Sequence, residues 1–212
     1  MSALDWDHNA YYQGLLLRYL PRPCSQVLDV GCGAGALAAE LATRSQHVDA
    51  LDRSPAMIDL ARLVTPSNVT CLLGDVLLEA LPDAHYDAIV SNTALHHMRL
   101  DQVLPRLARA LRPGGVLAVV ALPQIDLPRE IAAEACAAVA HRVLGAGFAI
   151  LRVSRGGGFY GMEPSHAIMP MVGGNLTTRQ VRQQAAALLP GAQVRRLVFW
   201  RYLLLWRKPV DS

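Results

Sequence analysis

The sequence VLDVGCGAGALAAEL (27–41) places a carboxylate just before three alternating glycines. Gly31, Gly33 and Gly35 allow a tight turn and a close approach of a ligand to the backbone, where a Cβ atom would clash. The spacing also satisfies the glycine fingerprint of dinucleotide-binding loops. Asp29 argues against a pyrophosphate, because its charge would repel phosphate and favour an ammonium or sulfonium group. The loop therefore predicts a site for a ligand that carries an amino-acid group.

The residues after the next two apolar segments suit a bound nucleoside. Asp52 can accept hydrogen bonds from both hydroxyls of a ribose. Asp75 can accept one from the exocyclic amine of adenine, and the backbone N–H of Val76 can donate to a ring nitrogen. Met57 can pack against a flat base. The alternatives are a solvated loop position for Asp52 and a place in the buried core for Met57.

The segment SNTALHHM (91–98) carries the candidates for proton transfer. Ser91 and Asn92 stand where an apolar segment ends, and His96 and His97 follow. A neutral imidazole accepts a substrate proton near physiological pH. Alternatively, one His caps the next helix and the other is solvated, and the pattern does not choose between the two. A metal site would need a third ligand that the spacing does not supply, so no metal is predicted.

Apolar segments and helical patterns alternate as far as residue 122, which predicts where these side chains lie. The expected strands are 26–30, 47–51, 68–73, 86–91 and 115–122, and the expected helices are 8–20, 35–44, 55–64 and 101–111. Ser54 and Pro55 mark the start of one helix, and Asp101 is expected to cap another. Strongly apolar strands joined by helices predict a parallel sheet covered on both faces. Ligands of such sheets bind beyond the carboxyl ends of the strands.

The region 124–176 departs from this alternation and is predicted to be an inserted lid. A long helix, 128–146, precedes the glycine- and proline-rich sequence RGGGFYGMEPSHAIMPMVGGN. Lids commonly carry substrate contacts, with solvated side chains as the alternative. The candidates are Tyr160, Glu163 and His166. After the lid, Thr177 is expected to cap a helix, and two terminal strand-like runs predict an antiparallel hairpin.

Composition and charge limit the classes of function. The 212 residues are 52% apolar and 17% charged, which fits one globular domain spanning 1–212. The net charge is +3 and the basic residues are scattered, so nucleic acid is not an expected partner. The four cysteines form no CxxC or Cys/His pair. Because the N-terminus lacks a signal-peptide pattern and charges interrupt 131–151, we expect a cytoplasmic protein without membrane contact.

Five segments together resemble the class I S-adenosylmethionine-dependent methyltransferases, of the small-molecule type called methyltransferase domain 11/25. They are VLDVGCGAGALAAELA, VDALDRSPAMIDLAR, LLGDVLLEALP, YDAIVSNTALHHM and LRPGGVLAVV, in the order and spacing of that family. The resemblance covers 25–122 and the terminal hairpin. It implies a Rossmann-like, doubly wound α/β fold of seven strands in the order 3-2-1-4-5-7-6, with helices on both faces and an antiparallel last strand.

The resemblance also implies roles for individual residues. The glycine loop and Asp29 hold the methionine portion of S-adenosylmethionine, and Asp52 holds the ribose. The implied cofactor-binding residues are Asp29, Gly31, Cys32, Gly33, Gly35, Asp52, Arg53, Met57, Asp75, Val76, Ser91, Asn92 and Tyr12. Tyr11 or Tyr12 closes over the cofactor. The implied substrate contacts are Tyr11, Tyr160 and Glu163. The segment after the fourth strand lacks an Asn-Pro-Pro motif and an acid triplet, which argues against nucleobase amino-group methylation and against a metal.

The predicted activity is transfer of the cofactor's methyl group to an O, N or C nucleophile of a small molecule. His96, His97 and His166 are the candidate bases for an acceptor that must lose a proton. The arginine-rich composition associates the chain with specialised metabolism in a high-GC genome. Two alternatives are a cofactor-binding relative that does not methylate and a NAD-type oxidoreductase, which Asp29 and the terminal hairpin disfavour. We expect a monomer or a homodimer.

Overall fold

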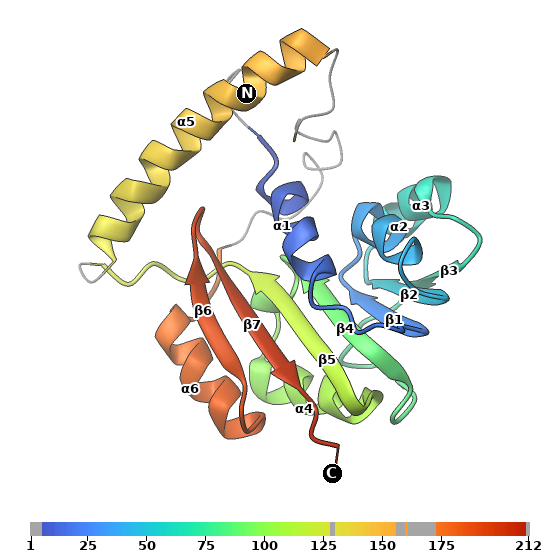
Figure 1. Cartoon of the computed structure of the whole chain (residues 1–212). Coiled ribbons are helices and arrows are strands. Elements are labelled where there is room, and N and C mark those ends of the chain that lie inside the picture. Colours follow the sequence, from blue (N-terminus) through green and yellow to red (C-terminus); the bar gives the residue numbers. More distant parts are fainter. Residues whose placement is uncertain (1–5, 128–129, 156–159, 161–172, 211–212) are drawn as a thin grey trace.

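The computed structural model describes residues 6–127, 130–155, 160 and 173–210. A seven-stranded sheet organises them in the order β3-β2-β1-β4-β5-β7-β6 (Figure 1). The strands are β1 (Gln26–Val30), β2 (His47–Asp52), β3 (Val69–Leu73), β4 (Tyr86–Asn92), β5 (Leu111–Ala121), β6 (Gln193–Leu197) and β7 (Arg201–Arg207). The first five strands are parallel, and β7 pairs antiparallel with both β5 and β6. The predicted fold and strand order are confirmed.

Helices cover both faces of this sheet and form two apolar cores. They are α1 (His8–Leu17), α2 (Ala36–Ala42), α3 (Pro55–Val64), α4 (Leu100–Ala110) and α6 (Thr178–Leu188). Buried residues of α4 and α6 pack with one face, where Leu28 and Leu117 lie. Those of α1, α2 and α3 pack with the other, where Val27 and Ala118 lie. Neighbouring strand residues point to opposite faces, which explains why these strands are apolar throughout.

Local signals set several boundaries as expected. The Ser54 side chain accepts a hydrogen bond from the Met57 backbone N–H and caps α3, which begins at Pro55. Thr177 and Gln180 form a reciprocal capping box at the start of α6. The predicted hairpin is also present, with a turn in which Phe199 and Trp200 adopt left-handed φ values of 59° and 58°.

Two predicted boundaries are wrong. Helix α4 begins at Leu100 after Arg99, so Asp101 lies in its first turn, where its carboxylate pairs with the Arg99 guanidinium at 2.6 Å. Strand β5 begins at Leu111, before the predicted start at residue 115, and contains a bulge near Gly114. The register there shifts, and the Gly114 N–H donates to the Lys208 carbonyl at 2.9 Å. The backbone at Gly114 therefore hydrogen-bonds to Lys208 near the C-terminus. The sequence around Gly114 does not predict such a distant partner.

Helix α5 (Ile131–Arg155) is longer than the predicted 128–146 and extends away from the sheet beside the N-terminal segment (Figure 1). The Trp6 indole N–H donates to the His141 carbonyl oxygen at 3.3 Å, which joins that segment to α5. Glu163 and His166 lie outside the described residues. Among the helices that are described, none has the length and apolarity needed to cross a membrane.

Candidate cofactor and substrate site

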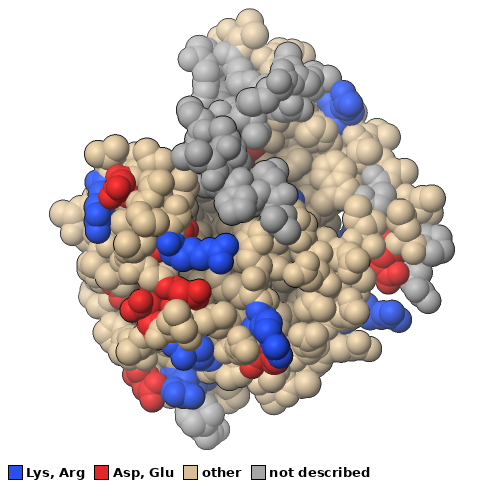
Figure 2. Space-filling model, turned by 180° about the vertical axis from the view of Figure 1, so that it is seen from behind, with Lys and Arg blue, Asp and Glu red and all other residues tan. Residues whose placement is uncertain are grey.

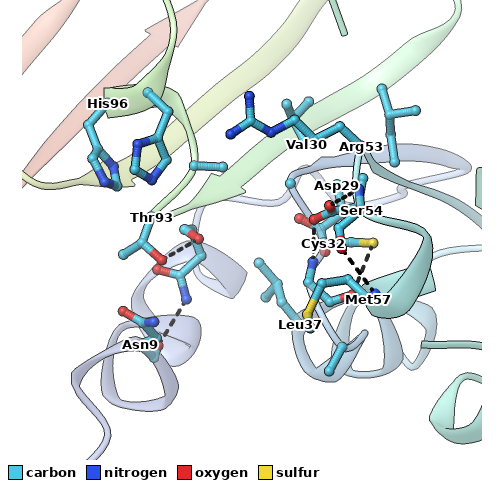
Figure 3. Close-up of a pocket in the computed structure, with 18 of the residues that line it drawn as sticks. Asn9, Asp29, Val30, Cys32, Leu37, Arg53, Ser54, Met57, Thr93 and His96 are labelled. Carbon is cyan, nitrogen blue, oxygen red and sulfur yellow. Dashed lines mark hydrogen bonds between the residues drawn. The ribbon is translucent and has the colours of Figure 1, made fainter. Parts of the chain in front are cut away.

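A cavity of about 520 Å³ lies at the carboxyl edge of the parallel strands, within the size range of small-ligand sites. Its walls come from the loops after β1, β2, β3 and β4, from the segment that begins α1, and from the start of β7. Figure 3 shows Asn9 and His96 on one side of the cavity, with Asp29, Cys32 and Met57 on the other. The expected edge of the sheet therefore carries the site.

The glycine loop forms one wall because two of its positions admit only glycine. Gly31 has a φ of +74°, and a Cβ atom there would lie 2.2 Å from the Ala94 Cβ atom, in the loop after β4. Gly35 has a φ of +88°, and its Cβ atom would lie 2.9 Å from the Ala61 Cα atom. The Gly31 backbone N–H also donates to the Leu51 carbonyl at 2.8 Å. Gly31 and Gly33 line the cavity, whereas Gly35 is the N-cap residue of α2 and is not among the described lining residues.

Asp29 lies at the cavity wall as a buried carboxyl group with a raised pKa. Its side chain is 1% exposed, and neither carboxylate oxygen has a hydrogen-bond partner among the described residues. Burial, and secondarily the nearby Asp52 carboxylate, raises the pKa of Asp29 to about 8. A buried polar group without a partner is costly and rare. This acid suits a cationic ligand group, which would restore its ionised form.

Asp52 is held in place by the backbone on either side of it. Its Oδ2 atom accepts from the Gly33 N–H at 2.9 Å, and its Oδ1 atom accepts from the Ser54 N–H at 2.9 Å. Each carboxylate oxygen has a further lone pair for a ligand hydroxyl. Asp52 lines the cavity, so a bidentate acceptor is available there for a vicinal diol.

The loops after β2 and β3 complete this wall. Asp75 lines the cavity and accepts from the Leu77 N–H at 2.9 Å, and Val76 is buried beside it. Met57 is both buried and part of the lining, so it belongs to the core and to the cavity. Cys32 also lines the cavity, and burial raises the pKa of its thiol, which therefore stays neutral. We call the wall formed by Asp29, Asp52 and Asp75 the acidic end.

Of the two residues predicted at the end of β4, Asn92 is among the described residues that line the cavity and Ser91 is not. Asn92 lines the cavity, and its Nδ2 atom donates to the Asn9 carbonyl at 3.0 Å, so it links β4 to α1. Ser91 is fully buried and donates to the Val30 carbonyl at 2.8 Å. Its hydroxyl joins two strands and is not part of the lining among the described residues.

His96 and His97 both line the cavity, with ring centroids 3.9 Å apart. They lie on a short 3-10 helix (Leu95–His97) that follows β4. Burial, and then the charge of Arg53, lowers the pKa of His97, which favours the neutral imidazole that a proton acceptor needs. Arg53 itself lines the cavity. Among the described residues, no group of three or more His, Cys, Asp or Glu side chains could hold a metal.

The three predicted tyrosines are not part of the cavity lining among the described residues. Tyr12 is buried, and its hydroxyl donates to the Val198 carbonyl in the hairpin turn. Tyr11 and Tyr160 pack around Trp6, with ring centroids 5.3 and 6.3 Å from it. Because Trp6 lines the cavity, these two tyrosines support its wall from behind.

Sequence reasoning missed a third group of lining residues. Trp6, Asn9 and Arg201 lie at the cavity wall opposite the glycine loop, and we call them the basic end. The Arg201 Nη2 atom donates to the Asn9 Oδ1 atom at 3.0 Å. The only available signal was the antiparallel hairpin: β7 runs back from the edge where the parallel strands end, so its first residue lies there.

The fold and this site define a class I S-adenosylmethionine-dependent methyltransferase. A family profile described as "Methyltransferase domain" matches residues 27–115. An uncharacterized methyltransferase of Mycobacterium bovis is 34% identical over 210 residues, which cover 97% of this chain and 98% of that protein. The chain therefore belongs to the methyltransferase family.

Two other proteins are similar over different extents. A malonyl-[acyl-carrier protein] O-methyltransferase of Serratia marcescens is 38% identical over 96 residues, which are 45% of this chain and 37% of that enzyme. The solved structure of an S-adenosylmethionine-dependent methyltransferase from Mesorhizobium loti is similar with a TM-score of 0.62 and 17% sequence identity. The superposed region covers 93% of this chain and 97% of the Mesorhizobium chain. At that identity the likeness shows the fold.

Proposed function

We propose that the protein transfers the methyl group of S-adenosylmethionine to an O, N or C nucleophile of a small molecule. The observation that carries this proposal is Asp29, a buried carboxylate at the glycine loop that has no hydrogen-bond partner in the described part of the chain. The cofactor's amino group supplies the cation that this acid lacks. Asp52 would hold the ribose hydroxyls, and Asp75 with the Val76 N–H would hold adenine. These residues thus suit the amino group, the ribose and the adenine of the cofactor.

The cofactor supplies a methyl group already activated by its sulfonium charge, so the chain mainly positions the acceptor. A hydroxyl or acidic carbon must also lose a proton. His97 suits this role because burial and Arg53 lower its pKa and keep the imidazole neutral. His96, in ring contact with it, and His166 are the alternative bases. An amine acceptor would need only to arrive unprotonated.

The proposal also covers the chemical class of the acceptor, the oligomeric state and cellular location of the protein, and its metabolic role. The Serratia relative is named as an O-methyltransferase, which supports keeping oxygen among the acceptors. Lys and Arg side chains are interspersed with Asp and Glu on the face shown in Figure 2, which supports a small molecule over a nucleic acid. We further propose a cytoplasmic monomer or homodimer. A role in specialised metabolism rests on the arginine-rich composition alone.

Two measurements test this function. Calorimetry should show binding of S-adenosylmethionine and S-adenosylhomocysteine and no comparable binding of NAD⁺, whose pyrophosphate would meet Asp29. Asp29→Asn should lower the affinity for S-adenosylhomocysteine by about tenfold or more, because the substitution removes a charge-assisted contact. The control is Asp83→Asn, an exposed acid outside the lining. Preferential binding of NAD⁺ would overturn the proposal.

Detection of S-adenosylhomocysteine release separates methyl transfer from the non-methylating alternative. The enzyme should form this product in step with a methylated acceptor. If cells that carry the protein convert its substrate while no S-adenosylhomocysteine is formed by the purified protein, the chain binds the cofactor for another purpose.

A further inference from the structure

The basic end contains a buried cation whose position follows from the antiparallel strand. Arg201 is the first residue of β7, next to Tyr202, which pairs with Ala121 at the carboxyl end of β5. The side chain therefore lies at the edge where the cavity opens, and it lines that cavity together with Leu122. Arg201 is 9% exposed, so its charge is largely removed from water.

The hydrogen-bond acceptors around Arg201 are neutral, and they use only some of its N–H donors. Its Nη1 atom donates to the Phe199 and Trp200 carbonyls, both at 3.3 Å, and its Nη2 atom donates to the Asn9 amide oxygen at 3.0 Å. All three acceptors are neutral. The Nε atom is buried and has no hydrogen-bond partner among the described residues. Three of the five N–H donors of the guanidinium are thus used, which leaves two donors for a ligand.

No carboxylate in the described part of the chain forms an ion pair with this guanidinium. Asp7 and Tyr12 act on Arg201 only through longer-range electrostatics. The Asp7 carboxylate is directed to the start of α1, where it accepts from the Asn9 and Ala10 N–H groups. Burial lowers the pKa of Arg201 to about 10, so the side chain is still protonated at neutral pH. Asp7 offsets part of the cost from a distance, but a buried charge that no carboxylate contacts is still unfavourable unless a ligand supplies that contact.

A structural role explains only part of this arrangement. Arg201 secures the hairpin turn, whose residues Phe199 and Trp200 hold left-handed φ values. A neutral amide side chain could donate to the same carbonyl groups without burying a charge. The cavity is also lined by Trp6, whose indole ring offers an apolar surface. An anionic group attached to an apolar body fits both features.

We propose that Arg201 binds a carboxylate of the acceptor substrate. The cavity then has complementary ends: Asp29 receives the cofactor's ammonium group, and Arg201 receives the acceptor's anion. This inference rests on the proposed function, because it assumes that the cofactor occupies the acidic end. The cofactor itself has a carboxylate, which is the other source of the same chemistry. The two sources predict opposite effects on cofactor affinity.

The test begins with protein saturated with S-adenosylhomocysteine, whose binding checks the proposed function separately. Hexanoate and 3-phenylpropionate are then titrated beside their neutral amides, with inorganic phosphate as a second anion, and binding is followed by calorimetry and by tryptophan fluorescence. At least one carboxylate should bind about tenfold or more tightly than its amide. Equal affinities, or binding of phosphate alone, would overturn the proposal. This comparison needs only the natural protein.

Variants then assign the preference to a residue. Arg201→Gln should abolish the preference for carboxylate over amide, and Arg201→Lys should retain part of it. Arg207→Gln is the matched control, because Arg207 is an exposed arginine at the other end of β7. Affinity for S-adenosylhomocysteine should be unchanged in all three. The control ligand is 5′-methylthioadenosine, which lacks the amino-acid group. If Arg201→Gln lowers the affinity for S-adenosylhomocysteine but not for 5′-methylthioadenosine, Arg201 binds the cofactor's carboxylate and the proposal is wrong.

Discussion

The acidic and basic ends of the cavity differ in how the chain assembles them. The acidic end uses Asp29 near the end of β1, Asp52 at the end of β2 and Asp75 just after β3, so each acid is placed by a strand that is local in the sequence. The basic end joins Trp6, Asn9 on α1 and Arg201 on the terminal hairpin, and Asn92 at the end of β4 holds Asn9 from the sheet. One end is made from consecutive strand-loop-helix units and the other from tertiary contacts. We expect substitutions at the two ends to separate cofactor binding from acceptor binding.

The largest expected effect is at the acidic end. Gly31→Ala forces a left-handed backbone position onto alanine and drives its Cβ atom into Ala94, so we expect a loss of about 2–4 kcal/mol in the free energy of unfolding and loss of cofactor binding. Gly14→Ala is the control, because Gly14 lies in α1 with nothing within 4 Å of the added carbon. Denaturant unfolding and calorimetry measure both effects. An unaffected Gly31→Ala protein would contradict the described loop.

The ribose contact should give the next largest effect. Asp52→Ala removes the acceptor that the Gly33 and Ser54 N–H groups share, together with its free lone pairs. We expect S-adenosylhomocysteine affinity to fall by about 10- to 100-fold. Asp59→Ala should change it little, since Asp59 is exposed and pairs only with exposed Arg62. Unchanged affinity in Asp52→Ala would show that the ribose lies elsewhere.

The ligand-free protein should lose stability as pH rises, because of Asp29. Its pKa is raised from 3.8 to about 8 in the folded state, so between these values the folded state binds a proton that the unfolded state has released. This residue therefore contributes a decrease of about 1.4 kcal/mol in the free energy of unfolding per pH unit within that window. Asp29→Asn should remove the contribution. Unfolding curves at several pH values compare the slopes of the two proteins.

The smallest expected effect is at Tyr12, predicted from the family resemblance to close over the cofactor. Its hydroxyl instead donates to the Val198 carbonyl and its ring is buried. Tyr12→Phe should therefore lower the free energy of unfolding by about 1 kcal/mol and leave S-adenosylhomocysteine affinity unchanged. A lower cofactor affinity with an unchanged free energy of unfolding would show that Tyr12 contacts the cofactor.

The same contrast explains how much the sequence could predict. Apolar strands and the Ser54 cap are local signals, so β1 to β4, α3 and the acids near the ends of the first three strands were predictable. Asp101 failed as a cap because Arg99, two residues earlier, takes its carboxylate. Arg201 carried no local signal, since its position depends on the pairing of β7 with β5 across distant sequence.

We propose that Asp29 binds the ammonium group of the cofactor, and proton release on binding tests this proposal most directly. At about pH 6.5 the carboxyl of the ligand-free protein is protonated, and a bound ammonium should drive it back to the ionised form. Calorimetric titration with S-adenosylhomocysteine in two buffers of different ionisation enthalpy should report release of about one proton by the natural protein and none by Asp29→Asn. Identical binding enthalpies in both buffers for the natural protein would contradict the account.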